Sequence, residues 1–172
     1  MKRRTLIFAG FALAATAPLG ACGFRPLLHQ AQGESVRGHL AAVRVSGLGG
    51  RLGQHLGTAL EDNLDPTSSG ESARYDLAIR LRNKNSALAI QLDNTITRYN
   101  LTLTAGFVLT RMEDQKVLYR SSVRRVASYN LRRAPFATLT AQKDAERRAA
   151  KEIADDIRTL LALHFQRGIE TT

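Results

Sequence analysis

Hydrophobic and polar residues alternate over several stretches in the middle of the chain. Apolar residues take every second position in 75–82, and a polar turn at 83–85 separates this stretch from a second one at 87–92. The alternation is longest over 99–110 and returns over 117–129. A period of two is typical of β-strands that bury one face. The pattern therefore predicts a hairpin followed by two further strands.

Two other segments repeat their apolar residues every three or four positions, which is typical of amphipathic helices. The first covers 52–64 and ends before Pro66, and the second is a long stretch at 138–165 with a charged outer face. A run at 39–45, closed by a glycine cluster, predicts a first strand. The expected order is strand, helix, four strands, helix. This order predicts an α+β fold, in which an antiparallel or mixed β-sheet of about four to five strands is covered on one face by two helices.

The strand predicted at 117–129 changes phase near its middle. Val117 and Val123 share one face, but Val126 falls on the other, and the charged pair Arg124 and Arg125 lies between them. A β-bulge inserts one extra residue into a strand and shifts its alternation by one position. The sequence therefore predicts a bulge at this point.

The first 21 residues have the three parts of a secretory signal peptide. A cationic start at 2–4 precedes an apolar run at 5–19, and small residues precede Cys22. The run is shorter than the ~20 residues that a membrane-spanning helix needs. The tetrad at 19–22 resembles a lipobox, so Cys22 is expected to be the site of lipid attachment. The alternative is an ordinary signal peptide followed by an unrelated cysteine.

Removal of the signal peptide leaves 151 of the 172 residues, which is a usual size for one domain. Residues 22–38 contain proline and glycine and little periodicity, which predicts a lipidated tether. Residues 39–172 are expected to form a single α+β domain. Because Cys22 is the only cysteine in the sequence, no internal disulfide is expected, and the fold depends on its core alone.

The chain carries a formal net charge of +10, of which +7 remains after the signal peptide is removed. For a cytosolic protein this charge would suggest a nucleic-acid partner, but no nucleic acid is expected to meet an exported lipoprotein. Anionic lipid headgroups and phosphorylated glycolipids lie beside such a protein, and its charge favours them as partners. The alternative is that the charge serves solubility only.

No arrangement of residues in the sequence suggests catalysis or metal binding. The four histidines are scattered over separate segments, and none has the spacing of a metal-ligand pair. Adjacent carboxylates such as Asp155 and Asp156 point about 100° apart on a helix, so they cannot act together on one substrate atom. The sequence therefore predicts no catalytic residue, no metal site and no cofactor.

The remaining chemical signal is a set of basic residues on the predicted strands. The set consists of Arg80, Arg82 and Lys84 in one strand and Arg124 and Arg125 in another, with Arg132 and Arg133 just after it. Guanidinium groups bind phosphate through two parallel hydrogen bonds. The first five residues are therefore predicted to bind a phosphorylated lipid. The alternative is that they protect exposed strand edges from aggregation.

Three segments resemble those of the LptE family, the lipopolysaccharide-assembly lipoproteins of Gram-negative outer membranes. They are 22–27 at the predicted mature N-terminus, 97–105 in a predicted strand, and 136–149 in the last predicted helix. Their order and spacing resemble the family over most of the mature chain. Family members often have an aromatic residue where Leu28 stands here, and no ligand-binding residue of the family can be transferred.

The resemblance implies a role that is not enzymatic. Members of the family insert into the lumen of the β-barrel LptD, help it to assemble, and assist delivery of lipopolysaccharide to the outer leaflet. The implied partners are LptD, lipopolysaccharide and, through acylated Cys22, outer-membrane lipid. The implied location is the outer membrane, with the domain facing the periplasm or inside the barrel. Gly23, in place of an aspartate, is similar to the pattern of lipoproteins that are sorted to that membrane.

Two other hypotheses stay open at this point. The lipoprotein subunit of a periplasmic phospholipid-transport system would share the anchor, the size and the mixed fold. It would purify with transporter components and without a large barrel. A periplasmic hydrolase would require a nucleophile and a base in one place, and the sequence offers no such pair.

Overall fold

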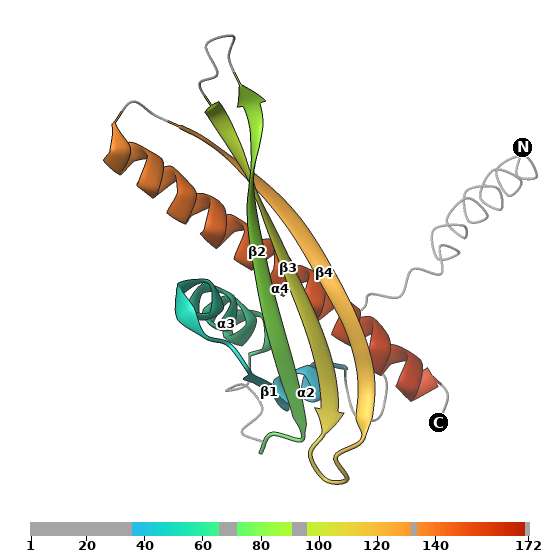
Figure 1. The fold of residues 1–172 in the computed structure, drawn as a ribbon. Coiled ribbons are helices and arrows are strands. Elements are labelled where there is room, and N and C mark those ends of the chain that lie inside the picture. The colour runs from blue at the N-terminus through green and yellow to red at the C-terminus, as the bar shows by residue number, and fades with distance from the viewer. Residues whose placement is uncertain (1–35, 66–71, 91–95, 132–133, 171–172) are drawn as a thin grey trace, which may run out of the picture.

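A four-stranded sheet with helices on one face forms the described part of the protein (Figure 1). The computed structural model describes residues 36–65, 72–90, 96–131 and 134–170. The predicted signal peptide, Cys22 and most of the predicted tether lie outside these ranges. The elements in chain order are α2 (Val36–Ala41), β1 (Val43–Ser46), α3 (Gly50–Leu64), β2 (Tyr75–Ile90), β3 (Ile96–Arg111), β4 (Val117–Asn130) and α4 (Pro135–Glu170).

The strands follow the order β1-β2-β3-β4 across the sheet. Strand β1 runs parallel to β2, and the other neighbouring strands are antiparallel. Helices α3 and α4 pack into one core on one side of the sheet. In Figure 1, α4 crosses behind the strands, α3 lies to the left of β2, and the short α2 lies near the lower end. No described element covers the other side, which we call the open face. The predicted α+β class is confirmed, with four strands in a mixed sheet and two main helices.

Alternating residues of β3 form the centre of the core. Five side chains of β3 that point toward the helices are at most 1% exposed: Leu101, Leu103, Ala105, Phe107 and Leu109. Helix α4 contributes Ala149, Ile153 and Ile157 to the same core, all fully buried. The helices predicted from periodicity are confirmed, because 138–165 lies within α4 and 52–64 lies within α3.

Strand β2 is continuous, so the predicted hairpin turn at 83–85 is wrong. The predicted turn residues pair in register with β3, from Asn83 opposite Leu103 to Asn85 opposite Leu101. The register of this pair of strands shifts near the end of β2 instead. Strand β3 offers 16 residues of hydrogen-bonding partners, and this long-range pairing outweighs the turn preference of three polar residues.

The first predicted strand is correct only in its second half. Val43–Ser46 forms β1, but the residues before it, including His39, lie in α2. Helix α2 buries Val36 and Leu40, which are one helical turn apart, and His39 Nδ1 lies 2.9 Å from the Tyr75 hydroxyl. Tertiary packing therefore selects a helix where a short apolar run alone favoured a strand. Helix α2 also includes the last residues of the segment predicted as a tether.

The β-bulge predicted at 124–126 does not occur. Arg125 stands in unbroken register opposite Leu103, on the side of the sheet that faces α4. There its guanidinium donates two hydrogen bonds to the Asp156 carboxylate of α4, at 2.6 and 2.5 Å. The ion pair lets a charged residue occupy a position on the helix side, which the alternation pattern alone would give to an apolar residue. The shift between these strands lies near the end of β3 instead, at Leu109.

Replacing Gly47 with alanine is expected to lower the free energy of unfolding by about 2–3 kcal/mol. Gly47 follows β1 with a φ of +77°, and a Cβ at this position would lie 2.9 Å from the carbonyl oxygen of Ile79. Urea denaturation followed by circular dichroism measures the change. Gly50→Ala is the matched control, because its φ is +69° but a Cβ there meets no atom within 4 Å. The control should lose only about 1 kcal/mol, the cost of a left-handed backbone conformation for a residue with a Cβ. Equal losses in the two variants would contradict the close approach of Gly47 to the Ile79 carbonyl.

Candidate anion-binding face of the sheet

Strand β2 places three cations on the open face. Leu77 and Ile79 are buried against the helices. Because side chains alternate along a strand, Arg80, Arg82 and Lys84 point to the opposite side, and all three are exposed. We call these three residues the β2 row.

Strand β4 places two further cations on the same face. Arg120 and Arg124 are exposed and stand in register with open-face positions of β3. The register aligns Arg82, Thr104 of β3 and Arg124 on one line across the three strands. Neighbouring strands lie about 4.8 Å apart, so the backbones of β2 and β4 are about 10 Å apart at this level. We call Arg120 and Arg124 the β4 row.

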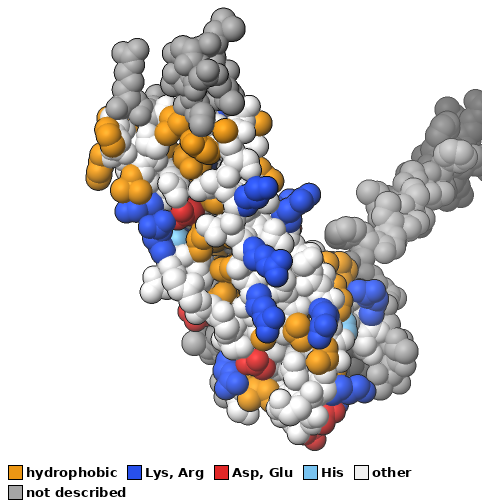
Figure 2. Space-filling view, viewed as in Figure 1, with side chains coloured by type: hydrophobic (Ala, Val, Ile, Leu, Met, Phe, Trp, Pro, Cys, Tyr) orange, Lys and Arg blue, Asp and Glu red, His pale blue; other side chains and the backbone are white. Residues whose placement is uncertain are grey.

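Strand β3 forms an uncharged floor between the two rows. Thr102 and Thr104 contribute hydroxyl groups, and the position of Gly106 is open, because a Cβ added there would meet no atom within 4 Å. Arg80 and Arg82 of the β2 row and Arg120 of the β4 row line a shallow depression of about 860 Å³. Figure 2 shows the Lys and Arg side chains in blue, spread along the strands of this face.

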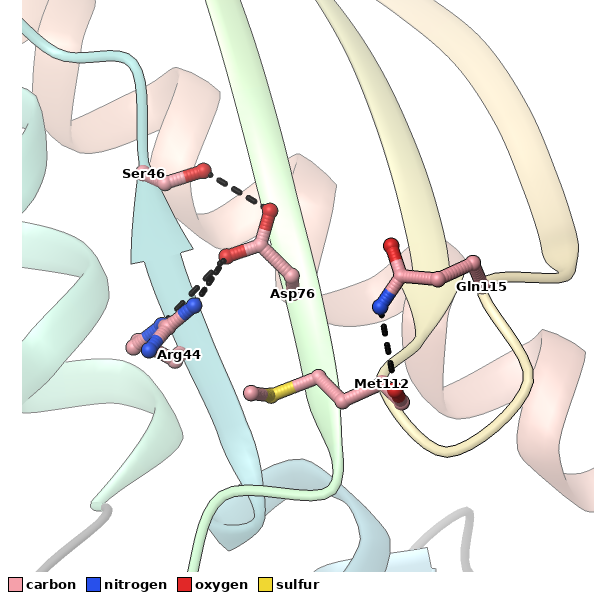
Figure 3. A network of polar contacts seen from close by, with 5 residues as sticks. All are labelled: Arg44, Ser46, Asp76, Met112 and Gln115. Atoms are coloured by element: carbon pink, nitrogen blue, oxygen red, sulfur yellow. Dashed lines mark hydrogen bonds and ion pairs between the residues drawn. The ribbon is translucent and has the colours of Figure 1, made fainter.

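The cations of the two rows have no ion-pair partner among the described residues. Asp76 is the only acidic residue in the four described strands, and its carboxylate is already engaged. It accepts hydrogen bonds from the Ser46 hydroxyl at 2.9 Å and from the Arg44 guanidinium at 3.3 Å (Figure 3). The positive charge of the two rows is therefore not balanced within the sheet, and this favours binding of a phosphate or another anion.

The structure brings four of the five predicted binding residues together and separates Arg125 from them. Arg125 points toward α4, where the hydrogen bond and the charge of Asp156 raise the pKa of its guanidinium. Residues 132–133, the arginines that follow the strand, lie outside the described residues. The open face therefore combines the β2 row with Arg124, and the role of Arg125 in ligand binding stays a prediction.

Sequence reasoning missed Arg120, which belongs to the β4 row. Arg120 lies four residues before Arg124, so the two share a face of any regular strand. The prediction selected the arginines next to the expected phase change and did not include Arg120. A strand with a single phase throughout would have grouped them correctly.

The open face offers cations and hydroxyl groups, which are groups that bind anions. Within the described residues, no three His, Cys, Asp or Glu side chains are placed to hold a metal ion. No described helix is long and apolar enough to cross a membrane.

Several solved lipoprotein structures have a similar fold. A candidate lipoprotein of Caulobacter crescentus CB15 is 26% identical, with a TM-score of 0.65, over 77% of this chain and 96% of that chain. An uncharacterized lipoprotein B of Nitrosomonas europaea is 12% identical, with a TM-score of 0.56, over 75% and 85% of the two chains. A minor lipoprotein of Acinetobacter baumannii is 17% identical, with a TM-score of 0.51, over 70% and 88%. The last two similarities concern the fold alone.

The sequence also matches a family profile across most of the domain. No curated protein matches the chain, but the LptE profile, described as lipopolysaccharide-assembly, matches residues 39–161. This range covers more than half of the chain and includes all four strands with both basic rows. The resemblance found in the sequence is therefore confirmed, and the chain belongs to the LptE family of lipopolysaccharide-assembly lipoproteins.

Proposed function

We propose that the protein is an outer-membrane lipoprotein that forms a complex with the β-barrel LptD, helps it to assemble and plugs it. In this complex it assists delivery of lipopolysaccharide to the outer leaflet, without catalysis of its own. A signal peptide at 1–21 directs export, acylated Cys22 anchors the chain in outer-membrane lipid, and residues 22–38 tether the domain at 39–172. Family membership supports this proposal, as does the similar solved structure from Caulobacter crescentus, whose name describes a lipoprotein.

The polar surfaces of the domain support a place inside a barrel. The lumen of an outer-membrane barrel is polar, whereas its lipid-facing wall is apolar. The open face carries cations and threonines, and the outer surface of α4 carries ion pairs of Asp144 with Arg147 and Arg148. Such surfaces remain hydrated next to a polar wall, so the domain can enter the lumen without burying unpaired charges in lipid.

The observation that carries the contact with lipopolysaccharide is the pair of basic rows on the open face. Lipopolysaccharide has phosphate groups on its lipid A and core, and guanidinium groups bind phosphate with two parallel hydrogen bonds. The rows lie on the side of the sheet that no described helix covers. A phosphorylated headgroup can therefore reach them without any rearrangement of the core.

Purification of the tagged, acylated protein from outer membranes in mild detergent tests the proposed complex. A large β-barrel should remain bound at high salt in stoichiometric amount, as identified by mass spectrometry. A Cys22→Ala variant is the control for anchoring and should leave the membrane fraction. Recovery of the protein alone would contradict the proposal, and recovery with transporter subunits would favour the phospholipid-transport alternative.

Removal of one cation from each row is expected to weaken binding of lipopolysaccharide by about tenfold or more. The variant is Arg82→Gln with Arg124→Gln, which removes two exposed guanidinium groups on one line across the sheet. A charge-assisted contact contributes about 1.5–3 kcal/mol, and 1.4 kcal/mol corresponds to a factor of ten in affinity. Fluorescence titration at fixed salt measures the dissociation constant. The matched control, Lys143→Gln with Lys151→Gln, removes the same charge from exposed positions of α4, and an equal loss there would contradict a localised site.

A further inference from the structure

We propose that the two basic rows recognise two separate phosphate groups of one ligand, roughly 10 Å apart and joined by an uncharged scaffold that carries hydroxyl groups. This inference rests on the proposed function, because it specifies which feature of the lipopolysaccharide headgroup the open face recognises. It also assigns Arg120 and Ser122 to the binding site.

Each row has the charge and geometry to hold one phosphate. Arg80 and Arg82 are two residues apart on one face of β2, about 7 Å along the strand, so both guanidinium groups can reach the same phosphate. In β4, Arg120 and Arg124 flank the exposed Ser122, whose hydroxyl can donate a further hydrogen bond. A phosphate monoester carries a charge of about −1.5 to −2 near neutral pH, which two guanidinium groups neutralise.

The floor between the rows suits the uncharged part of such a ligand. Arg80, Gly106 and Ser122 stand opposite one another across the sheet, and the missing side chain at Gly106 leaves the middle of this line open. On the next line, Thr104 places a hydroxyl between Arg82 and Arg124. Because the floor supplies hydroxyl groups and no cation, it favours a sugar over a third phosphate at this point.

The competing arrangement is a single phosphate at the middle of the floor, held by long arginine side chains from both rows. The two arrangements differ in how affinity depends on the number of phosphates. Two separate subsites require two phosphates for full affinity, whereas a shared site is filled by one. The phosphate count of the ligand and the number of rows in the protein can be changed independently.

The test compares diphosphoryl lipid A with monophosphoryl lipid A as probes for the mature full-length chain, in one detergent at one ionic strength. We expect the wild-type protein to bind the diphosphoryl lipid about a hundredfold more tightly, because loss of one phosphate removes the charge-assisted contacts of two guanidinium groups. Two row variants complete the experiment: Arg80→Gln with Arg82→Gln, and Arg120→Gln with Arg124→Gln. All four positions are exposed, and circular dichroism checks that the variants fold.

Each row variant should weaken binding of the diphosphoryl lipid by about a hundredfold, because it removes both guanidinium groups of one phosphate subsite. It should change binding of the monophosphoryl lipid by no more than about twofold, because the remaining row still holds one phosphate. Equal affinity of the wild-type protein for the two lipids would overturn two separate subsites and leave the proposed function intact. Equal weakening of both lipids by each row variant would overturn it in favour of the shared site. Binding of neither lipid would overturn both this inference and the proposed contact with lipopolysaccharide.

Discussion

Replacement of Phe107 with alanine is expected to lower the free energy of unfolding by about 3–5 kcal/mol. The Phe107 side chain is 1% exposed, and its ring lies 5.9 Å from that of Tyr119. Across the strands it stands opposite Ile79 and the small Ser121, which cannot fill the space that the ring would leave. Loss of the buried ring and creation of a cavity therefore add together. Thermal unfolding followed by circular dichroism should show a midpoint lowered by roughly 10 °C.

Phe136→Ala is the matched control for this prediction. It makes the same chemical change at the start of α4, where the side chain is 80% exposed. A substitution on the surface usually changes stability by no more than about 0.5 kcal/mol. A loss below 1 kcal/mol for Phe107→Ala, or similar losses in both variants, would contradict the central position of Phe107 in the core.

The elements that the sequence predicted well are those whose own side chains decide their structure. Strand β3 and helix α4 have long, regular apolar patterns, and the structure buries those residues, such as Leu103 and Ile157. The predicted first and last residues of these two elements were less accurate, because capping and fraying at the ends depend on neighbouring elements. The α+β class followed from these regular segments and from their order along the chain.

The elements that were predicted incorrectly depend on partners far away in the sequence. The polar residues at 83–85 resemble a turn, but their backbone pairs with β3, which is outside any local window. His39 belongs to α2 because its ring contacts Tyr75 and stacks on Phe165, 36 and 126 positions further along the chain. Short segments have little intrinsic preference for helix, strand or turn, so tertiary contacts determine which of these structures they form.

Only part of the candidate site was predicted, because the position of each side chain depends on the phase of its strand. The side-chain period of a strand is two, so an error of one residue in phase moves a side chain to the other face of the sheet. The pattern suggested such a shift because Val126 falls out of phase with Val117 and Val123, whereas the structure keeps one phase and places Arg125 on the helix side. Its partner Asp156 lies 31 residues later in α4 and could not be identified from local spacing. A period of two applied to the whole strand would still have placed Arg120 and Arg124 on one face.

Replacement of Arg51 with alanine is expected to lower the free energy of unfolding by about 2–4 kcal/mol, because it leaves a buried carboxylate without its cation. Glu146 of α4 is 2% exposed, and its Oε2 accepts hydrogen bonds from Arg51 Nη2 at 2.6 Å and Nε at 3.1 Å. Burial is strong in this region: it raises the pKa of the nearby Tyr129, and the charge of Glu146 acts in the same direction. Urea denaturation of the two proteins measures the difference.

Glu146→Gln separates the cost of a buried unpaired charge from the loss of the contact itself. A glutamine fills the same volume, can still accept a hydrogen bond from Arg51, and can pair with Gln142, which donates to Glu146 at 3.1 Å in the native protein. It removes the charge, and Arg51 remains about half exposed to water. We therefore expect Glu146→Gln to cost less than about 1.5 kcal/mol. A larger loss for Glu146→Gln than for Arg51→Ala would mean that attraction between the two charges, rather than the penalty of burying one of them, holds α3 against α4.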